Sequence, residues 1–294
     1  MPATPNYLVV GIDGMLGAAI HARLSRADCR VIGTSRRGSP GTIRLDLSQP
    51  ASSWKLPPYI NVAFLCAGMT SVPMCREIPK LAWAVNVTGT AELARRLAAN
   101  GAFVVFPSSN RVFDGSVPYQ RAEAPTCPRT EYGRTKAAAE ECLLALGDAA
   151  GVIRFTKILG QSTRLIKDWK ASATTARVVQ PFIDMKMAPI SITRAVDIML
   201  GIGLSRTAHI SQASGAEDVT YETACRFAWA LMGADVSLVS PIQCRDASVL
   251  VDHVPKFTTL DAHRVTSLTG LSPPSIEATL QDVLQPNGPS PRLP

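Results

Sequence analysis

The sequence predicts an α/β fold with a doubly wound parallel sheet and a smaller C-terminal lobe. Three observations support this: an apolar run ends in a glycine-rich turn, short apolar runs alternate with helical patterns, and the 294 residues suit one large α/β unit or two lobes. Such alternation indicates parallel strands joined by right-handed crossovers. We expect residues 1–157 to form the first domain and residues 158–294 mainly the second lobe, with some segments returning to the first domain.

Strands are expected at short apolar runs, and helices where apolar residues recur at helical intervals. The expected strands are Tyr7–Val10, Arg30–Thr34, Val62–Cys66, Ala102–Phe106 and Gly151–Phe155. The expected helices are His21–Ala27, Leu81–Asn100, Tyr132–Leu146 and Tyr221–Met232. The second of these helices stops at Asn100-Gly101, a common C-terminal signal.

The charge balance indicates an anionic ligand rather than a nucleic acid. The net charge is +7, yet the basic residues form no continuous cluster and aromatic residues make up only 6% of the chain. Proteins that bind single strands stack bases on aromatic side chains, and that feature is not evident. A small anion, such as a phosphorylated ligand, therefore suits the charge better than a nucleic acid partner.

Other sequence features limit the cellular location of the protein and the kinds of site that it can contain. No segment stays apolar for the roughly 18 to 20 residues of a membrane span, and the N-terminus does not resemble a signal peptide. We expect a cytoplasmic protein without a membrane partner. Seven cysteines without a C-x-x-C pair and four histidines without ligand spacing predict neither disulfides nor a metal site.

A glycine-rich turn, GIDGMLG, follows the first expected strand. Gly11 would make the turn, Gly14 would let a pyrophosphate approach the backbone, and Gly17 would let helix and strand pack. Met15 and Leu16 complete the loop, which indicates a dinucleotide site of the Rossmann type. The even three-residue spacing differs from G-x-G-x-x-G, so the loop by itself also fits a plain strand-to-helix turn.

Asp13 lies inside this loop, where a carboxylate facing the pyrophosphate would repel it. We therefore predict that its side chain turns away and accepts backbone N–H bonds at the start of the helix, as aspartate does at N-caps.

The end of the second expected strand favours NADP(H) over NAD(H). An acid there selects NAD and an arginine selects NADP. The sequence reads Ser35-Arg36-Arg37, and no acid lies between Asp28 and Asp46. Either arginine would meet a 2′-phosphate, with Ser35 adding a hydrogen bond. The alternative is a pair of solvated arginines on a loop.

Three further pieces predict a ketone reduction. Ser108 and Ser109 follow a buried strand, Tyr132 and Lys136 are one helical turn apart on one face, and Asn86 is a polar residue inside an apolar helix pattern. A phenol has a pKa of about 10, and a neighbouring ammonium would lower it enough for proton transfer. A serine hydroxyl beside it would hydrogen-bond the substrate carbonyl. Without the serine and the glycine loop, the Tyr-x-x-x-Lys pair would fit a surface helix equally well.

Together these motifs make the sequence resemble the extended short-chain dehydrogenases/reductases, and within them the dTDP-4-dehydrorhamnose reductase group. The resemblance spans nearly the whole chain. The matching stretches are GIDGMLG, Leu45-Asp46-Leu47, LCAGMTSV, AVNVTGT, SSNRVFDG, YQRAEAPTCPRTEYGRTKAAAEE, APISI and KFTTLDAHRV.

The resemblance implies a role for each catalytic candidate. Tyr132 would be the proton donor, and Lys136 would bind the nicotinamide ribose and lower the tyrosine's pKa. Ser109 would be the hydroxyl partner, since it stands three residues before the valine of VFDG. Asn86 would support the proton relay.

The resemblance also implies binding residues. Asp46 and Leu47 would lie by the adenine, and Cys66-Ala67-Gly68 along the cofactor. The basic stretch that contains Arg164, Lys167 and Lys186 falls where such enzymes hold a nucleotide diphosphate, although a solvated face explains it as well.

Departures from the group's pattern concern the substrate. Arg111 stands where that group usually carries tyrosine, and we expect it to contact the substrate. Asn110 replaces an aspartate, which counts against a dehydratase. His253-Val254-Pro255 replaces a segment that usually contains arginine. The sugar is therefore open, whereas the hydride chemistry is unaffected.

The expected function is an NADPH-dependent reductase of a 4-keto-6-deoxy nucleotide sugar. A homodimer that associates through the expected helices Leu81–Asn100 and Tyr132–Leu146 fits the resemblance. One alternative is an epimerase of the same superfamily with tightly bound NAD. Another is a non-catalytic, NADP-binding regulatory subunit, although such proteins tend to lose the tyrosine or the lysine.

Overall fold

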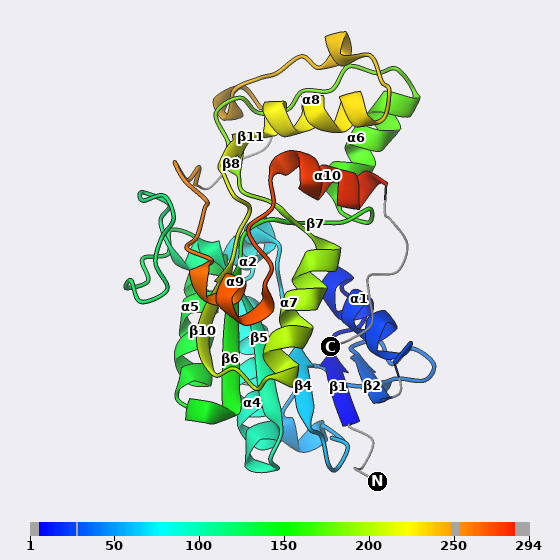
Figure 1. Cartoon of the computed structure of the whole chain (residues 1–294). Helices are drawn as coiled ribbons and strands as arrows, with labels where there is room; N and C mark the ends of the chain where they lie inside the picture. The colour runs from blue at the N-terminus through cyan, green and yellow to red at the C-terminus, as the bar shows by residue number, and fades with distance from the viewer. Residues whose placement is uncertain (1–5, 28, 248–252, 286–294) are drawn as a thin grey trace.

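A seven-stranded sheet forms the centre of the molecule (Figure 1). The computed structural model describes residues 6–27, 29–247 and 253–285. All neighbouring strands are parallel and follow the order β10-β6-β5-β4-β1-β2-β3, which confirms the predicted doubly wound sheet. The strands are β1 (Asn6–Val10), β2 (Arg30–Ser35), β3 (Ile43–Arg44), β4 (Val62–Leu65), β5 (Phe103–Ser109), β6 (Ala150–Phe155) and β10 (His209–Ala213).

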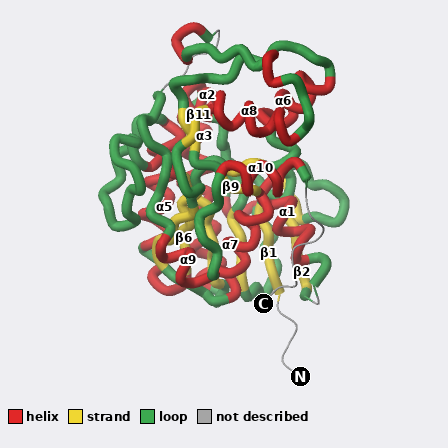
Figure 2. Tube along the Cα trace, turned by 45° about the horizontal axis from the view of Figure 1, so that its top comes forward, coloured by secondary structure: helices red, strands yellow, loops and turns green. Residues whose placement is uncertain are grey.

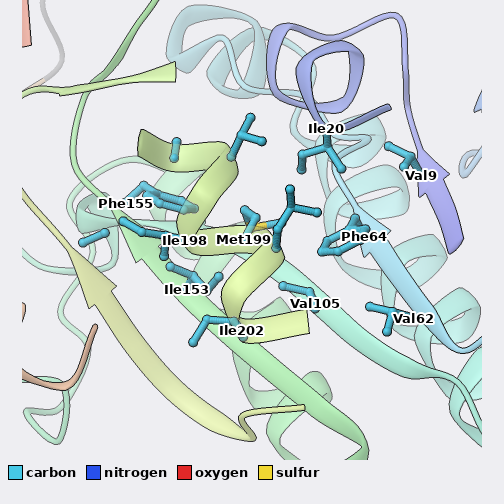
Figure 3. Packing of buried hydrophobic residues seen from close by; sticks show 14 of the residues in the cluster. Val9, Ile20, Val62, Phe64, Val105, Ile153, Phe155, Ile198, Met199 and Ile202 are labelled. Atoms are coloured by element: carbon cyan, nitrogen blue, oxygen red, sulfur yellow. The ribbon is translucent and has the colours of Figure 1, made fainter. Parts of the chain in front are cut away.

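Helices cover both faces of this sheet. One face packs against α1 (Met15–Leu24) and α7 (Ile192–Leu204), where Ile20 and Met199 lie over Phe64 (Figure 3). The other packs against α4 (Thr90–Ala99) and α5 (Glu131–Leu144). The sheet is buried on both sides, so its strands are continuous apolar runs. Shorter helices are α2 (Val72–Glu77), α3 (Pro79–Trp83) and α9 (His263–Thr269).

A smaller group of helices lies beyond one end of the sheet, at the top of Figure 1 and toward the viewer in Figure 2. Its buried core includes Trp169, Trp229 and Leu280, one from each helix. The helices are α6 (Arg164–Thr174), α8 (Tyr221–Leu231) and α10 (Ile276–Leu284). Two short strand pairs join them to the sheet: β7 (Ile158–Leu159) with β9 (Ile190–Ser191), and β8 (Lys186–Met187) with β11 (Val219–Thr220).

Two helices differ from the prediction. The first begins at Met15 and ends at Leu24, rather than spanning His21–Ala27, because it starts directly after the glycine loop. The predicted helix Leu81–Asn100 is three pieces: α3, a π-helical segment over Ala84–Gly89, and α4. None of the helices in the described part of the chain has the length and apolar character needed to span a bilayer.

The π-helical segment lies against a distant part of the chain. A Cβ on Gly89 would lie 2.1 Å from the carbonyl oxygen of Leu47, so the backbone of the connection after β3 lies directly against the helix. The Thr90 hydroxyl donates to the Val85 carbonyl oxygen at 2.9 Å, five residues back. Such π-bulges are frequent at functional sites.

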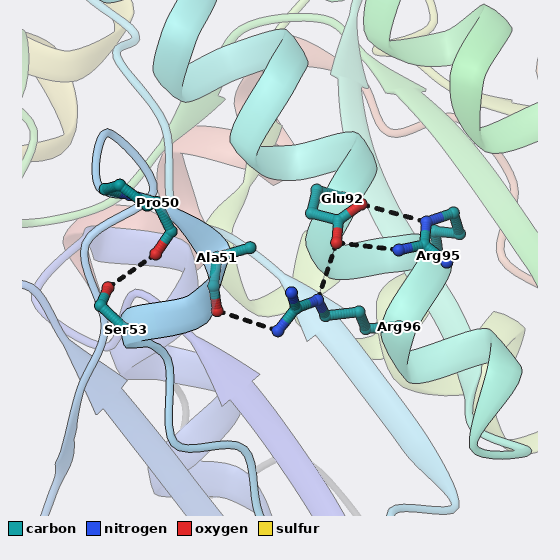
Figure 4. A network of polar contacts seen from close by, with 6 residues as sticks. All are labelled: Pro50, Ala51, Ser53, Glu92, Arg95 and Arg96. Atoms are coloured by element: carbon teal, nitrogen blue, oxygen red, sulfur yellow. Dashed lines mark hydrogen bonds and ion pairs between the residues drawn. The ribbon is translucent and has the colours of Figure 1, made fainter.

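A charged network ties the later part of the connection between β3 and β4 to α4 (Figure 4). Arg96 donates from Nη1 to the Ala51 carbonyl oxygen at 2.9 Å and from Nε to Glu92 at 2.7 Å. Arg95 also binds Glu92, and the hydrogen bonds from the two arginines lower the pKa of that carboxyl to about 2. The segment between β3 and β4 is thereby tied to α4.

Candidate active site

A cavity of about 480 Å³ opens at the carboxyl ends of β1, β4 and β5, between the sheet and the smaller helical group. This edge of an open parallel sheet is where ligands bind. The sequence-predicted residues that line the cavity are Gly14, Met15, Leu16, Cys66, Ala67, Gly68, Asn86, Ser109, Arg111, Tyr132, Lys136 and Lys186.

The cavity wall has a strong positive bias. Four basic residues line it, namely Arg111, Lys136, Lys157 and Lys186, and no aspartate or glutamate is found among the described lining residues. Low-dielectric walls that carry one sign of charge concentrate ligands of the opposite sign. The cavity is therefore suited to an anion.

Ser109 and Tyr132 both line this cavity, close enough for the Ser109 hydroxyl to act on the pKa of the phenol. Burial raises the pKa of Tyr132 to about 12, while the Ser109 hydroxyl and the charge of Arg111 act in the opposite direction. The cation that lowers this pKa is Arg111 rather than Lys136, the residue predicted from the sequence. Desolvation is the dominant effect, so the phenol is neutral at physiological pH and able to donate a proton.

Lys136 lies one turn further along α5. Its Nζ donates to the Pro107 carbonyl oxygen at 2.5 Å and stands 3.8 Å from the ring centroid of Phe106. Burial lowers the pKa of this ammonium to about 8, and the charge of Glu140 opposes that effect. The side chain is thus held against the carboxyl-terminal part of β5, at Phe106 and Pro107.

The Asn86 side chain forms hydrogen bonds to two neighbouring elements. Its Oδ1 accepts from Met69 N at 2.7 Å, and its Nδ2 donates to the Met69 carbonyl oxygen at 2.9 Å and to Thr135 Oγ1 at 3.1 Å. Asn86 therefore joins the loop after β4 to α5, and its part in a proton relay stays a prediction.

The β1–α1 loop turns sharply at Gly11, whose φ is +87° and whose amide donates to the Thr34 carbonyl oxygen at 3.1 Å. A Cβ on Gly17 would lie 2.3 Å from the Gly11 carbonyl oxygen, so helix and loop are in close contact. Gly14 is different: its nearest neighbour would be 3.5 Å away, and it lines the cavity. The backbone at Gly14 is therefore open to a ligand.

The N-cap prediction for Asp13 is wrong. The cap of α1 is Gly14, without a side-chain hydrogen bond, and Asp13 Oδ2 instead accepts from Ser35 Oγ at 2.7 Å. The reason is tertiary: Ser35 ends the neighbouring strand β2, and its hydroxyl holds the Asp13 carboxylate at the end of β2 instead of at the start of α1.

Several predicted cofactor residues lie beside the cavity rather than on it. Ser35, Arg36 and Arg37 lie at the carboxyl end of β2, and the two arginines are exposed. Asp46 accepts from the Ser48 amide and hydroxyl, and Leu47 is buried beneath α4. None of Gly11, Gly17, Ser35, Arg36, Arg37, Asp46 and Leu47 is among the described cavity-lining residues.

The predicted basic stretch is split in space. Lys186 lines the cavity, with its Nζ 5.7 Å from the ring centroid of Phe257. Arg164 is 94% exposed and pairs with Asp168 at 3.4 Å, and Lys167 on the same helix is exposed too. The structure therefore does not bring Arg164 and Lys167 to the cavity, and a solvated face describes them.

Comparison with known proteins assigns the family. A family model described as the RmlD substrate binding domain matches residues 6–288. The chain belongs to this family. This confirms the resemblance to extended short-chain dehydrogenases/reductases of the dTDP-4-dehydrorhamnose reductase group.

The relatives of this RmlD family member include both methionine adenosyltransferase subunits and dTDP-4-dehydrorhamnose reductases. The methionine adenosyltransferase 2 subunit beta of Pongo abelii is 28% identical and covers 90% of this chain and 83% of its own. The dTDP-4-dehydrorhamnose reductase of Streptomyces griseus is 29% identical and covers 81% and 79%. A dTDP-4-dehydrorhamnose reductase of Bacillus anthracis in complex with NADP has the same fold, with a TM-score of 0.83 at 17% identity, and covers 97% and 99%.

The RmlD-type cavity also contains residues that sequence reasoning missed. Thr258 belongs to the KFTTL stretch that the resemblance included, and the Asp218 carboxylate accepts from both its amide and its hydroxyl at 2.6 Å. No local pattern marks the other missed residues, which lie in connections and on α8: Thr156, Lys157, Thr163 and Tyr221.

Proposed function

We propose that the chain is an NADPH-dependent reductase of a 4-keto-6-deoxy nucleotide sugar. The observation that carries this proposal is the meeting of Ser109, Tyr132 and Lys136 in one positively charged cavity at the carboxyl edge of the sheet. The dTDP-4-dehydrorhamnose reductases among the relatives support the substrate class. The NADP and NADPH named with two structural neighbours support the cofactor.

The residues present fit a dinucleotide. Gly14 leaves the backbone open where α1 begins, and the N-terminus of a helix favours a pyrophosphate. Arg36 and Arg37 supply positive charge at the end of β2, where the adenosine ribose lies in this class of sheet. A bound reduced nicotinamide would supply the hydride for a ketone carbon.

The chain's own side chains then handle the proton and the carbonyl. Tyr132, neutral because burial raises its pKa, donates its proton to the carbonyl oxygen of the sugar. The Ser109 hydroxyl, which lines the same cavity, hydrogen-bonds the same oxygen. The Arg111 guanidinium, which already lowers the pKa of Tyr132, stabilises the negative charge that proton loss leaves on the phenol, while Lys136 would bind the nicotinamide ribose. Arg111 and Lys186, which also line the cavity, bind the anionic part of the substrate.

The test is turnover with defined substrates. Purified protein is mixed with NADPH and a panel of nucleotide sugars that carry a 4-keto-6-deoxy group. Loss of the reduced-nicotinamide absorbance with one of them, and formation of the matching 4-hydroxy sugar, is the expected result. Absence of turnover with the whole panel would contradict the proposal.

A second candidate function is a non-catalytic subunit, which the methionine adenosyltransferase 2 subunit beta relatives favour. The Ser109, Tyr132 and Lys136 set speaks against it. Stable association with a methionine adenosyltransferase catalytic chain, together with cofactor binding but no turnover, would support this candidate. An epimerase is the third, and NAD that copurifies with the protein would favour it.

The remaining expectations stay part of this proposal. They are a cytoplasmic location, a possible homodimer, the absence of a nucleic acid partner, and a division of roles in which residues 1–157 bind the dinucleotide while residues 158–294 mainly hold the substrate.

A further inference from the structure

The contact between Asp13 and Ser35 gives the edge of the sheet an unusual charge pattern. Ser35 is fully buried at the end of β2, and its hydroxyl donates to Asp13 Oδ2 at 2.7 Å. The same oxygen of Ser35 accepts the Arg37 amide at 3.1 Å. Because a hydroxyl has a single proton, Ser35 directs it to Asp13, and the carboxylate is held across the end of β2.

The neighbouring arginines leave their charges free. Arg36 and Arg37 are exposed, and neither guanidinium has an ion-pair partner in the described part of the chain. The described residues likewise offer Asp13 no partner besides Ser35. One carboxylate and two guanidinium groups therefore face the solvent at the place where the adenosine ribose of a dinucleotide lies.

These two kinds of group favour different dinucleotides. A carboxylate at this position accepts hydrogen bonds from the ribose hydroxyls of NAD(H), whereas arginine accommodates the 2′-phosphate of NADP(H). In most sheets of this kind the acid follows β2 itself. Here β2 ends in Ser35-Arg36-Arg37, and the acid comes from the loop after β1, within hydrogen-bond distance of that end.

We propose that Asp13 is a specificity-determining residue that opposes the 2′-phosphate and supports the ribose diol, so that this chain binds NADH and NADPH with similar affinity. The inference rests on the proposed function, since it requires a dinucleotide in the glycine loop. Arg36 and Arg37 offset the repulsion between Asp13 and the 2′-phosphate. Removing only the charge of Asp13 therefore shifts the preference toward NADPH.

The experiment compares dissociation constants of NADH and NADPH by fluorescence titration. In the wild type we expect the two constants to lie within about tenfold of each other. Asp13→Asn keeps an acceptor for Ser35 but removes the charge, and should increase the preference for NADPH by about tenfold or more. Asp148→Asn is the matched control: its side chain is 97% exposed and far along the chain, and the preference should not change.

The outcomes separate the inference from the proposed function. If the wild type binds and oxidises NADPH but Asp13→Asn leaves the preference unchanged, the inference is wrong and the proposed reductase stands. If the wild type binds neither dinucleotide, both fail. The unfolding midpoint of Asp13→Asn is measured alongside, and Asp13→Ser serves as a second uncharged variant if Asp13→Asn folds poorly.

Discussion

Arg154 and Glu140 form an ion pair in the interior of the molecule, with Nη2 and Oε2 2.7 Å apart and both side chains only 2% exposed. Arg154 also donates from Nη1 to the Ala122 carbonyl oxygen at 2.9 Å and stacks on Phe113, 4.8 Å from its ring centroid. The pair therefore joins β6, α5 and the loop before α5. Glu140 is one turn beyond Lys136, so this pair also fixes the helix that carries the catalytic candidates.

Breaking this pair should destabilise the protein strongly. Glu140→Ala leaves a buried guanidinium without its counter-charge, which costs about 3–5 kcal/mol. Chemical denaturation measures the free energy of unfolding. Glu123→Ala is the matched control, because its partner Arg121 is 3.7 Å away and both side chains are 78% exposed. We expect that variant to stay within about 1 kcal/mol of the wild type. Equal losses in both variants would contradict the argument.

Two glycines of the β1–α1 loop should differ in how much stability an alanine costs. A Cβ on Gly17 meets the Gly11 carbonyl oxygen at 2.3 Å, so Gly17→Ala forces the backbone apart and should cost about 1–3 kcal/mol of stability. A Cβ on Gly14 meets nothing closer than 3.5 Å, so Gly14→Ala should stay within about 1 kcal/mol.

The same pair tests the proposed cofactor site. Gly14→Ala places a methyl group where a pyrophosphate would approach, and the affinity for NADPH should fall by about tenfold or more. Unfolding curves and fluorescence titrations measure the two effects. A Gly14→Ala variant with unchanged NADPH affinity would argue against phosphate binding at this loop.

The sheet could be predicted from sequence because its signals are local. Each strand is a short apolar run buried on both faces, such as Val62–Leu65, and the order of strands and helices specifies a parallel arrangement. The π-helical segment could not be predicted in this way. It lies at the contact between Gly89 and Leu47, two residues far apart in the sequence, and no local pattern records that contact.

The residues of the candidate site show the same difference between local sequence signals and long-range contacts. Ser109, Tyr132 and Lys136 could be placed together, because a strand end and an i, i+4 pair are local patterns and parallel strands end at one edge. The positions of Thr258 and of the Asp13 side chain could not be predicted. Their positions depend on the Asp218 carboxylate and on the Ser35 hydroxyl, which approach only after the chain has folded.

The stability contribution of Lys136 should depend on pH in a defined direction. Burial lowers the pKa of its ammonium from 10.5 to about 8, so between these values the unfolded chain holds a proton that the folded chain has released. Stability therefore rises with pH in this window, by up to about 1.4 kcal/mol per pH unit.

The Lys136→Met variant isolates this effect. It lacks the titrating group, while the buried thiols, which also titrate on unfolding, are shared with the wild type. Between about pH 7 and pH 9.5, the unfolding free energy of the wild type minus that of Lys136→Met should rise by about 1–2 kcal/mol. A difference that stays level or falls would show that Lys136 is not desolvated as the structure indicates.

Tyr132 offers the most direct test of the proposed chemistry. Burial raises its pKa to about 12, so the neutral phenol is the form present at neutral pH and the form that donates a proton to a ketone. Tyr132→Phe removes only the hydroxyl and should lower kcat by about 10²–10⁴-fold, while the dissociation constant of NADPH changes little.

Tyr119→Phe is the control, because that hydroxyl donates to the Ala216 carbonyl oxygen and the residue is 56% exposed. Its kcat should equal that of the wild type. Near-normal turnover by Tyr132→Phe would mean that another group supplies the proton, and Ser109, which lines the same cavity, would be the next residue to replace.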